Sequence, residues 1–142
     1  MWKSIVLSLL LVAPGVGAIS NEELLDAGEA FPARIAAVRR DAVEVTFKIA
    51  EGYYLYRDKL HFAVASDAAH LGTPVLPKGK IKKDEFFGKV EIYRGALKIK
   101  LPLADAPAGT RFMLTVHSQG CADIGVCYPP FEQSLTVELP AA

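Results

Sequence analysis

The chain has 142 residues, of which 16 are basic and 16 acidic, so its formal net charge is zero. This length suits one domain. The balanced charge gives no support to nucleic acid or an anionic membrane as a partner. Hydrophobic residues make up 51% of the sequence, and part of that fraction comes from the first segment.

The first 18 residues have the features of a secretory signal peptide. Lys3 supplies a positive charge, residues 4–12 are mostly Ile, Val and Leu, and small residues end at Ala18. This apolar run is too short to span a membrane, and no later run approaches that length. We predict cleavage after Ala18, and a mature domain of residues 19–142 that is exported and does not insert into the membrane.

After this segment the chain has one helical signal and then a series of strand signals. Residues 21–30 predict a short helix that Asn21 caps and that ends near Pro32. From residue 33 onwards, apolar and polar residues mostly alternate, which is the period of a strand with one buried face. The clearest alternation covers residues 43–49, 97–103, 112–116 and 135–139.

Weaker strand signals lie between these segments, at residues 33–38, 53–56, 60–65 and 90–94. Turn-forming pairs such as Glu51-Gly52 and Arg94-Gly95 separate the runs. About eight short strands in a domain of this size predict an all-β fold, an immunoglobulin-like β-sandwich.

The chain contains two cysteines, Cys121 and Cys127, and five residues separate them. They lie on a connection between two of the clearest predicted strands, so we expect them at one end of the sandwich. Pro129 and Pro130 follow and end regular strand pairing. An exported domain meets an oxidising compartment, where two nearby thiols can form a lasting disulfide.

Two interpretations of this pair are open on spacing alone. A disulfide that closes so short a loop stabilises a fold by only about 2 to 2.5 kcal/mol, so a redox role deserves weight. Exchange requires an accessible sulfur and a second thiol that resolves the mixed disulfide. The only charge between the cysteines, Asp123, is not one that activates a thiol. The alternative function is an exported binding module whose disulfide only stiffens a loop.

Three segments resemble, in the same order, segments of one known family: residues 51–57, 84–94 and 119–130. They are similar to parts of the N-terminal periplasmic domain of the thiol:disulfide interchange protein DsbD, and together they span most of the mature chain. The resemblance implies a periplasmic immunoglobulin-like domain. It also implies thiol:disulfide interchange activity of the protein-disulfide reductase type, without a cofactor.

In that family the domain relays electrons through a reversible disulfide. The resemblance implies that Cys127 forms the mixed disulfide with a partner and that Cys121 resolves it. The donor would be a membrane electron-transfer protein or a thioredoxin-like protein. The acceptors would be thioredoxin-like periplasmic proteins of the disulfide isomerase or cytochrome c maturation type. Because the family protein continues into membrane and thioredoxin-like domains, the chain is either a stand-alone relay or part of a longer protein.

The resemblance also assigns the residues around the cysteines. It matches five residues to a cap loop that shields the disulfide: Asp84, Glu85, Phe86, Phe87 and Gly88. Phe87 stands where the family commonly has tyrosine. Five further residues are expected to surround the cysteines: Tyr54, Tyr56, Gly120, Asp123 and Tyr128. Ordinary packing in the core is the alternative for the aromatic residues.

The remaining chemical groups give weaker signals. Three scattered histidines (His61, His70 and His117) and the single methionine of the mature chain, Met113, do not predict a metal site. We expect His117 to be solvated or on an edge strand. The four lysines of residues 78–83 predict a solvated loop face that could tune an encounter with an acidic partner.

Overall fold

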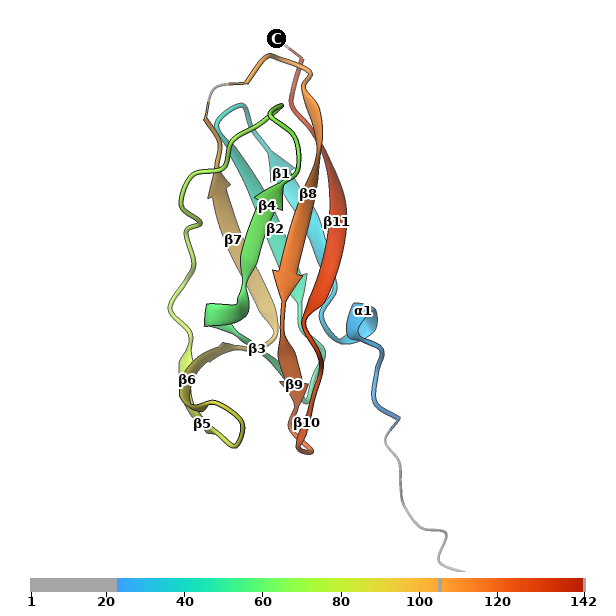
Figure 1. The fold of residues 1–142 in the computed structure, drawn as a ribbon, viewed down its shortest axis with the longest axis vertical. Helices are drawn as coiled ribbons and strands as arrows, with labels where there is room; N and C mark the ends of the chain where they lie inside the picture. Colours follow the sequence, from blue (N-terminus) through green and yellow to red (C-terminus); the bar gives the residue numbers. More distant parts are fainter. Residues whose placement is uncertain (1–22, 105, 142) are drawn as a thin grey trace, which may run out of the picture.

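The structure, a computed structural model, describes residues 23–104 and 106–141. The predicted signal peptide, its cleavage site and Asn21 lie outside the described residues. Within these ranges the strands form three antiparallel sheets, two of which run along the long axis while the third lies toward one end (Figure 1). None of the helices in the described ranges has the length and apolar character that a membrane crossing requires.

The first sheet has the order β1-β2-β7. Its strands are β1 (Ala33–Val38), β2 (Ala42–Lys48) and β7 (Ala96–Pro102). The alternation in the sequence places the apolar residues of β2 and β7 on one face, and Val45 lies opposite Ile99 in the register. Both side chains are fully buried.

The second sheet has the order β11-β8-β4 and covers the apolar face of the first (Figure 1). Its strands are β4 (His61–Val64), β8 (Arg111–Ser118) and β11 (Phe131–Glu138). Leu114, Val116 and Val137 join the same buried cluster as Val45 and Ile99. Burying each such side chain stabilises the fold by about 1.5 to 3 kcal/mol. The predicted all-β, immunoglobulin-like sandwich is confirmed.

The third sheet, of order β10-β9-β3-β6-β5, lies at one end of the sandwich (Figure 1). Its strands are β3 (Tyr53–Tyr56), β5 (Lys80–Asp84), β6 (Gly88–Tyr93), β9 (Gly120–Ala122) and β10 (Val126–Cys127). The turn from β9 to β10 contains Gly125 with a φ of 100°, which residues with a side chain rarely adopt. The connection that carries the cysteines is therefore a short β-hairpin.

The predicted helix is shorter than expected. The α-helix α1 covers only Ala27–Ala30, and a 3₁₀ turn, η1, covers Arg57–Lys59. The prediction was wrong for residues 23–26, where the backbone of Leu25 bonds to two tyrosine side chains instead. Its N–H donates to the hydroxyl of Tyr53, and its carbonyl accepts from the hydroxyl of Tyr128.

Two further expectations are corrected. The lysine-rich stretch is not a loop over residues 80–84, because these residues form β5 and pair with β6 along five positions. For His117 only the edge-strand alternative is wrong, because β8 is the middle strand of its sheet. Its side chain is 41% exposed, as the solvated alternative requires, and His117 lies opposite His61 on one side and Glu132 on the other.

Candidate functional site

The two cysteines lie directly opposite each other on the β9–β10 hairpin and are joined in a disulfide. On its other side β9 pairs with β3, which places Tyr54 opposite Cys121. Cys121 has no exposed area, whereas Cys127 is partly exposed. The hairpin therefore encloses Cys121 and leaves Cys127 partly exposed.

The tyrosines of β3 divide between two buried clusters. Tyr53 and Leu55 point into the main core. Tyr54 and Tyr56 point to the opposite face, as the alternation of a strand requires, and form a second cluster with Ile92 and Cys121. The structure thus brings both predicted tyrosines against the disulfide, not into the core between the main sheets.

Asp84, the last residue of β5, is a buried carboxylate beside this second cluster, with 5% of its surface exposed. Its Oδ2 atom accepts hydrogen bonds from the hydroxyls of Tyr54 and Tyr56, the second at 2.7 Å. Its Oδ1 atom accepts from the backbone N–H groups of Phe86 at 2.7 Å and Phe87 at 2.9 Å. Four donors therefore compensate for its removal from water.

These contacts set the protonation states around the disulfide. Burial alone raises the pKa of Asp84, but the hydrogen bonds from Tyr54, Tyr56 and the two backbone groups outweigh burial, so the pKa lies below its ordinary value of 3.8. Burial and then the bond to Asp84 raise the pKa of Tyr54 to about 12, and the same causes raise the pKa of Tyr56. At neutral pH the carboxyl is ionised and both hydroxyls keep their protons.

Tyr56 connects this network to the sulfurs. Its hydroxyl oxygen lies 2.9 Å from Sγ of Cys121 and 3.5 Å from Sγ of Cys127. The ring of Phe87 packs edge-on against Tyr56, with 5.0 Å between the ring centroids. The predicted cap residue therefore covers the tyrosine that touches both sulfurs.

The rest of the predicted cap loop forms the turn between β5 and β6. Phe86 and Phe87 are 51% and 46% exposed, so neither is a core residue. Glu85 is exposed, and Gly88 has a φ of 76°, which favours glycine. Because Asp84 holds the N–H groups of both phenylalanines, the same carboxylate that binds the tyrosines also fixes the turn.

Asp123, the only charge between the cysteines, is paired with a cation from another element. Both of its oxygens accept hydrogen bonds from Arg94, at 2.9 and 2.8 Å. The guanidinium of Arg94 also lies 5.2 Å from the centroid of the Tyr54 ring. The sequence shows no cation between the cysteines, and the fold supplies one from the turn after β6. Arg94 is the last residue of the segment 84–94 that resembles the family, and this position was the one sign in the sequence of a role at the site.

Gly120 and Tyr128 position the hairpin against the main core. A Cβ atom at residue 120 would lie 2.7 Å from ring atoms of Phe31, so a side chain does not fit there. The ring of Tyr128 packs edge-on against Phe31 at 5.4 Å, and its hydroxyl donates to the carbonyl of Leu25. Tyr128 therefore supports the hairpin from the side of the main core. Its ring packs near Tyr53, whereas Tyr54 and Tyr56 pack against each other on the opposite face.

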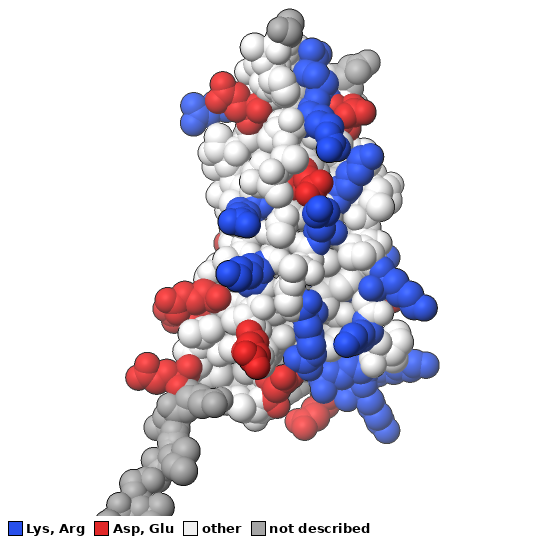
Figure 2. Space-filling view, turned by 180° about the vertical axis from the view of Figure 1, so that it is seen from behind, with Lys and Arg blue, Asp and Glu red and all other residues white. Residues whose placement is uncertain are grey.

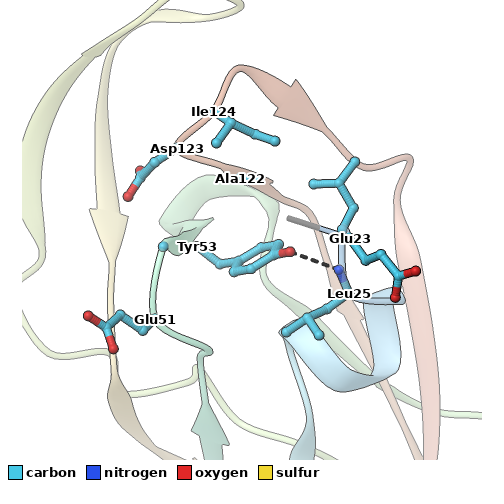
Figure 3. A pocket seen from close by; sticks show the side chains of 9 residues that line it. Glu23, Leu25, Glu51, Tyr53, Ala122, Asp123 and Ile124 are labelled. Carbon is cyan, nitrogen blue, oxygen red and sulfur yellow. Dashed lines mark hydrogen bonds between the residues drawn. The ribbon is translucent and has the colours of Figure 1, made fainter. Parts of the chain in front are cut away.

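A hollow of about 500 Å³ lies beside the hairpin, on the side of the N-terminal segment. Figure 3 shows Tyr53 at its floor with its hydroxyl bonded to the N–H of Leu25, and Ile124 above it on the hairpin turn. Glu23, Glu51 and Asp123 place carboxylates around it. In the part of the chain that the structure describes, no group of three potential metal-ligating side chains gathers.

Comparison with known proteins points to one family. The model of the family described as "Thiol:disulfide interchange protein DsbD, N-terminal" matches residues 21–139. The thiol:disulfide interchange protein DsbD of Ralstonia nicotianae is 46% identical over 144 residues, which cover 96% of this chain and 23% of that protein. The chain thus spans about a quarter of the length of this relative.

Two solved structures from Neisseria meningitidis agree with this fold. The reduced N-terminal domain of DsbD is 38% identical, with a TM-score of 0.71 over 81% of this chain and 90% of that chain. The second structure describes the complex between the DsbD N-terminal and PilB N-terminal domains; it is 38% identical, with a TM-score of 0.67 over 82% of this chain and 88% of that chain. The sequence match over nearly all of the described fold and the disulfide on the β9–β10 hairpin lead to one conclusion: the chain belongs to the family of the N-terminal domain of the thiol:disulfide interchange protein DsbD.

Proposed function

We propose that this domain relays electrons in the periplasm by reversible opening of the Cys121–Cys127 disulfide. The observation that carries the proposal is the unequal exposure of the two residues, since Cys121 is fully buried and Cys127 is partly exposed. Exchange begins on an accessible sulfur. Cys127 is then the residue that a donor attacks, and Cys121 is the internal thiol that resolves the mixed disulfide in the reverse direction.

In the reducing step, a thiolate of the donor bonds to Sγ of Cys127 and the Cys121–Cys127 bond breaks, so that Cys121 leaves as a thiolate. The second thiolate of the donor then attacks the donor's own sulfur in the mixed disulfide, and Cys127 leaves as a thiolate. The donor ends as a disulfide, and two protons convert the domain to a dithiol. Transfer to an acceptor follows the same steps in reverse.

The tyrosine network acts on the leaving sulfur. The hydroxyl of Tyr56 lies 2.9 Å from Sγ of Cys121 and can turn its proton from Asp84 toward the new thiolate. Asp84 keeps its other three donors during this change. Its negative charge disfavours a lasting thiolate nearby, so the reduced domain holds its electrons as thiols until a partner engages.

The cap limits which molecules reach the disulfide. Phe87 packs on Tyr56, which contacts both sulfurs, so its ring hinders small thiols that approach the bond from that side, while Cys127 stays partly exposed. We propose that a partner protein displaces Phe87 and Phe86 on docking. The hydroxyl that the family's tyrosine would supply at residue 87 is absent, and cover by the ring remains.

The proposal includes export and partners. Residues 1–18 would direct the chain to the periplasm, where residues 19–142 form the redox domain. The donor would be a membrane electron-transfer protein and the acceptors thioredoxin-like proteins. The complex of a related DsbD N-terminal domain with the PilB N-terminal domain supports a protein as partner.

The direct test is capture of the mixed disulfide. Cys121→Ser in the full chain leaves Cys127 free to bond a partner and removes the thiol that releases it. After incubation with periplasmic extract, this variant should accumulate discrete disulfide-linked complexes with thioredoxin-like proteins. The matched variant Cys127→Ser keeps one buried thiol and should accumulate none. Equal capture by both variants, or none by either, would contradict the assignment.

A further inference from the structure

The β5–β6 hairpin carries lysines without ion pairs. Ion pairs among the described residues join Arg57 to Glu91, Arg94 to Asp123, Lys98 to Glu44, and His117 to Glu132. Five lysines near the cap take part in none of them: Lys59, Lys80, Lys82, Lys83 and Lys89. Figure 2 shows basic side chains gathered at the lower right, over the end of the molecule where β5 and β6 lie. In a chain of zero net charge, this clustering concentrates positive potential beside the cap.

The arrangement works against the stability of the hairpin. Lys83 lies directly opposite Lys89 in the β5–β6 register. Like charges in opposite positions of an antiparallel pair are destabilising. Charged residues on an edge strand such as β5 also prevent unwanted strand pairing, but one sign of charge is not required for that. The charges of the hairpin are mostly positive, since Glu85 is the one exposed carboxylate and Glu91 is paired with Arg57, and this excess of lysines points to a partner.

Three of these lysines lie against the aromatic residues of the site: Lys59, Lys82 and Lys89. The Nζ atom of Lys59 lies 5.0 Å from the centroid of the Phe87 ring, and that of Lys82 lies 5.4 Å from the Tyr54 ring. Lys59 and Lys89 also line a hollow of about 260 Å³, together with Tyr56 and Phe87 and with the carboxylates Asp58 and Glu91. Because Glu91 is paired with Arg57, a side chain of a docking protein that enters this hollow meets two lysines and one carboxylate, Asp58, that has no ion pair among the described residues, beside the residue that covers the disulfide.

The other side of the same end has the opposite charge. Glu23 and Glu51 line the hollow of Figure 3 and form no ion pair among the described residues. The end of the domain that carries the disulfide is thus basic on the side of the cap and acidic on the side of α1. A flat anionic surface such as a bilayer would be repelled by the acidic side, whereas a protein of matching polarity is oriented by both.

We propose that these five residues, the cap lysines (Lys59, Lys80, Lys82, Lys83 and Lys89), form a docking surface for a carboxylate-rich rim beside the active site of the thioredoxin-like partner. The inference rests on the proposed function and names the surface chemistry of that partner. Complementary potentials raise association rates by about 10-fold to 1,000-fold at low ionic strength. Attraction to the cap lysines would bring the partner to the loop that it must displace.

The test uses three charge reversals in the full chain: Lys80→Glu, Lys83→Glu and Lys89→Glu. This variant retains Lys59 and Lys82, which contact the Phe87 and Tyr54 rings, and it keeps a charge on the edge strand. The matched control reverses three exposed cations elsewhere, Arg39→Glu, Lys100→Glu and Arg111→Glu, which lie after β1, on β7 and at the start of β8. Both variants change the net charge equally.

The probe is a reduced thioredoxin-like domain with a Cys-x-x-Cys pair, made in three forms whose rim carries four glutamates, four glutamines or four lysines. Its rate of reducing the disulfide is divided by the rate with neutral 2-mercaptoethanol for each variant. The native chain should react at least about tenfold faster with the glutamate form than with the lysine form at low salt. The difference should vanish near 1 M salt, where the Debye length is about 3 Å.

In the variant with the three lysine reversals, the order of the reduction rates with the three forms of the probe should reverse. In the control variant the order should stay that of the native chain. The same order in both variants, or rates that do not depend on salt, would overturn the docking surface while leaving exchange itself established. Binding of the native chain, but not the variant, to phosphatidylglycerol vesicles with an unchanged order of rates would assign the lysines to a membrane and also overturn it. If no form of the probe reduces any variant, the proposed function fails and this inference fails with it.

Discussion

In the sandwich, β2, β7 and β8 bury Val45, Ile99 and Leu114 completely, and each is an aliphatic side chain that needs no hydrogen-bond partner. The third sheet, at the end of the sandwich, instead buries hydroxyls, sulfur and a carboxylate around Cys121. Hydrogen bonds join the hydroxyls of Tyr54 and Tyr56 to Asp84, and that of Tyr56 also lies next to Cys121. The main core stabilises by apolar area, whereas the small cluster depends on geometry. Substitutions should therefore separate stability from exchange according to the region they touch.

The largest expected effect is the loss of exchange in Cys127→Ser. The partly exposed sulfur is the proposed point of attack, so transfer between two thioredoxin-like proteins should fall to the uncatalysed rate. The fold should survive, because a bridge over this short loop contributes only about 2 kcal/mol. Circular dichroism checks the fold and a coupled exchange assay checks the transfer. Residual transfer through Cys121 alone would contradict Cys127 as the point of attack.

In the main core, Ile99→Ala should lower the free energy of unfolding by about 2 to 5 kcal/mol, because it leaves a cavity where the side chain has no exposed area. The milder Ile99→Val should cost about 0.5 to 1.5 kcal/mol. Urea unfolding measures both values. The exchange rate per folded molecule should stay that of the native chain, and a large drop in that rate would show that the two regions are coupled.

At the redox end, Asp84→Asn should cost about 1.5 to 3 kcal/mol at neutral pH, because the ionised acceptor of two tyrosines is lost. Folding lowers the pKa of Asp84 below its ordinary value of 3.8. The ionised carboxylate therefore contributes its full stabilisation of the fold at a pH well above 3.8, and this contribution disappears as the pH falls through the folded-state pKa. The gap in stability between native chain and variant should therefore narrow below about pH 5. A gap that is constant from pH 7 to strongly acidic pH would contradict an ionised Asp84.

The smallest effect on stability is expected at the cap. The double substitution Phe86→Ala and Phe87→Ala should change the free energy of unfolding by less than about 1 kcal/mol, because both rings are about half exposed. The double variant should nevertheless be reduced several times faster by small thiols. Ile81→Ala, which removes an exposed apolar side chain from the same hairpin, is the matched control and should react like the native chain. Equal rates for all three proteins would count against shielding.

The sequence predicted the strands of the main core because their period reflects burial on one face. Residues 43–49 and 97–103 alternate, and the structure places β2 and β7 there within one residue. The same rule put Tyr54 and Tyr56 on one face. β5 was missed because it is an edge strand with Lys80, Lys82 and Lys83, so its pairing depends on the backbone of β6 and not on an apolar face.

The errors at the site come from contacts between residues distant in sequence. The helix was predicted to begin too early because the hydroxyls that bond Leu25 belong to tyrosines 28 and 103 positions away. Arg94 reaches Asp123 across 29 positions. Local patterns indicate which face a residue takes, but not which distant group will meet it. The buried acceptor role of Asp84 was hidden for the same reason.

The reduction potential of the Cys121–Cys127 pair decides whether this disulfide is a relay or only a structural bridge. The native chain would be equilibrated with a thioredoxin-like protein of known potential, and the oxidised fraction measured after acid quenching and thiol alkylation. A relay should reach equilibrium through direct exchange and lie above about −300 mV. A potential below that value, with no exchange during the experiment, would identify a bridge that serves only the fold and would rule out a relay.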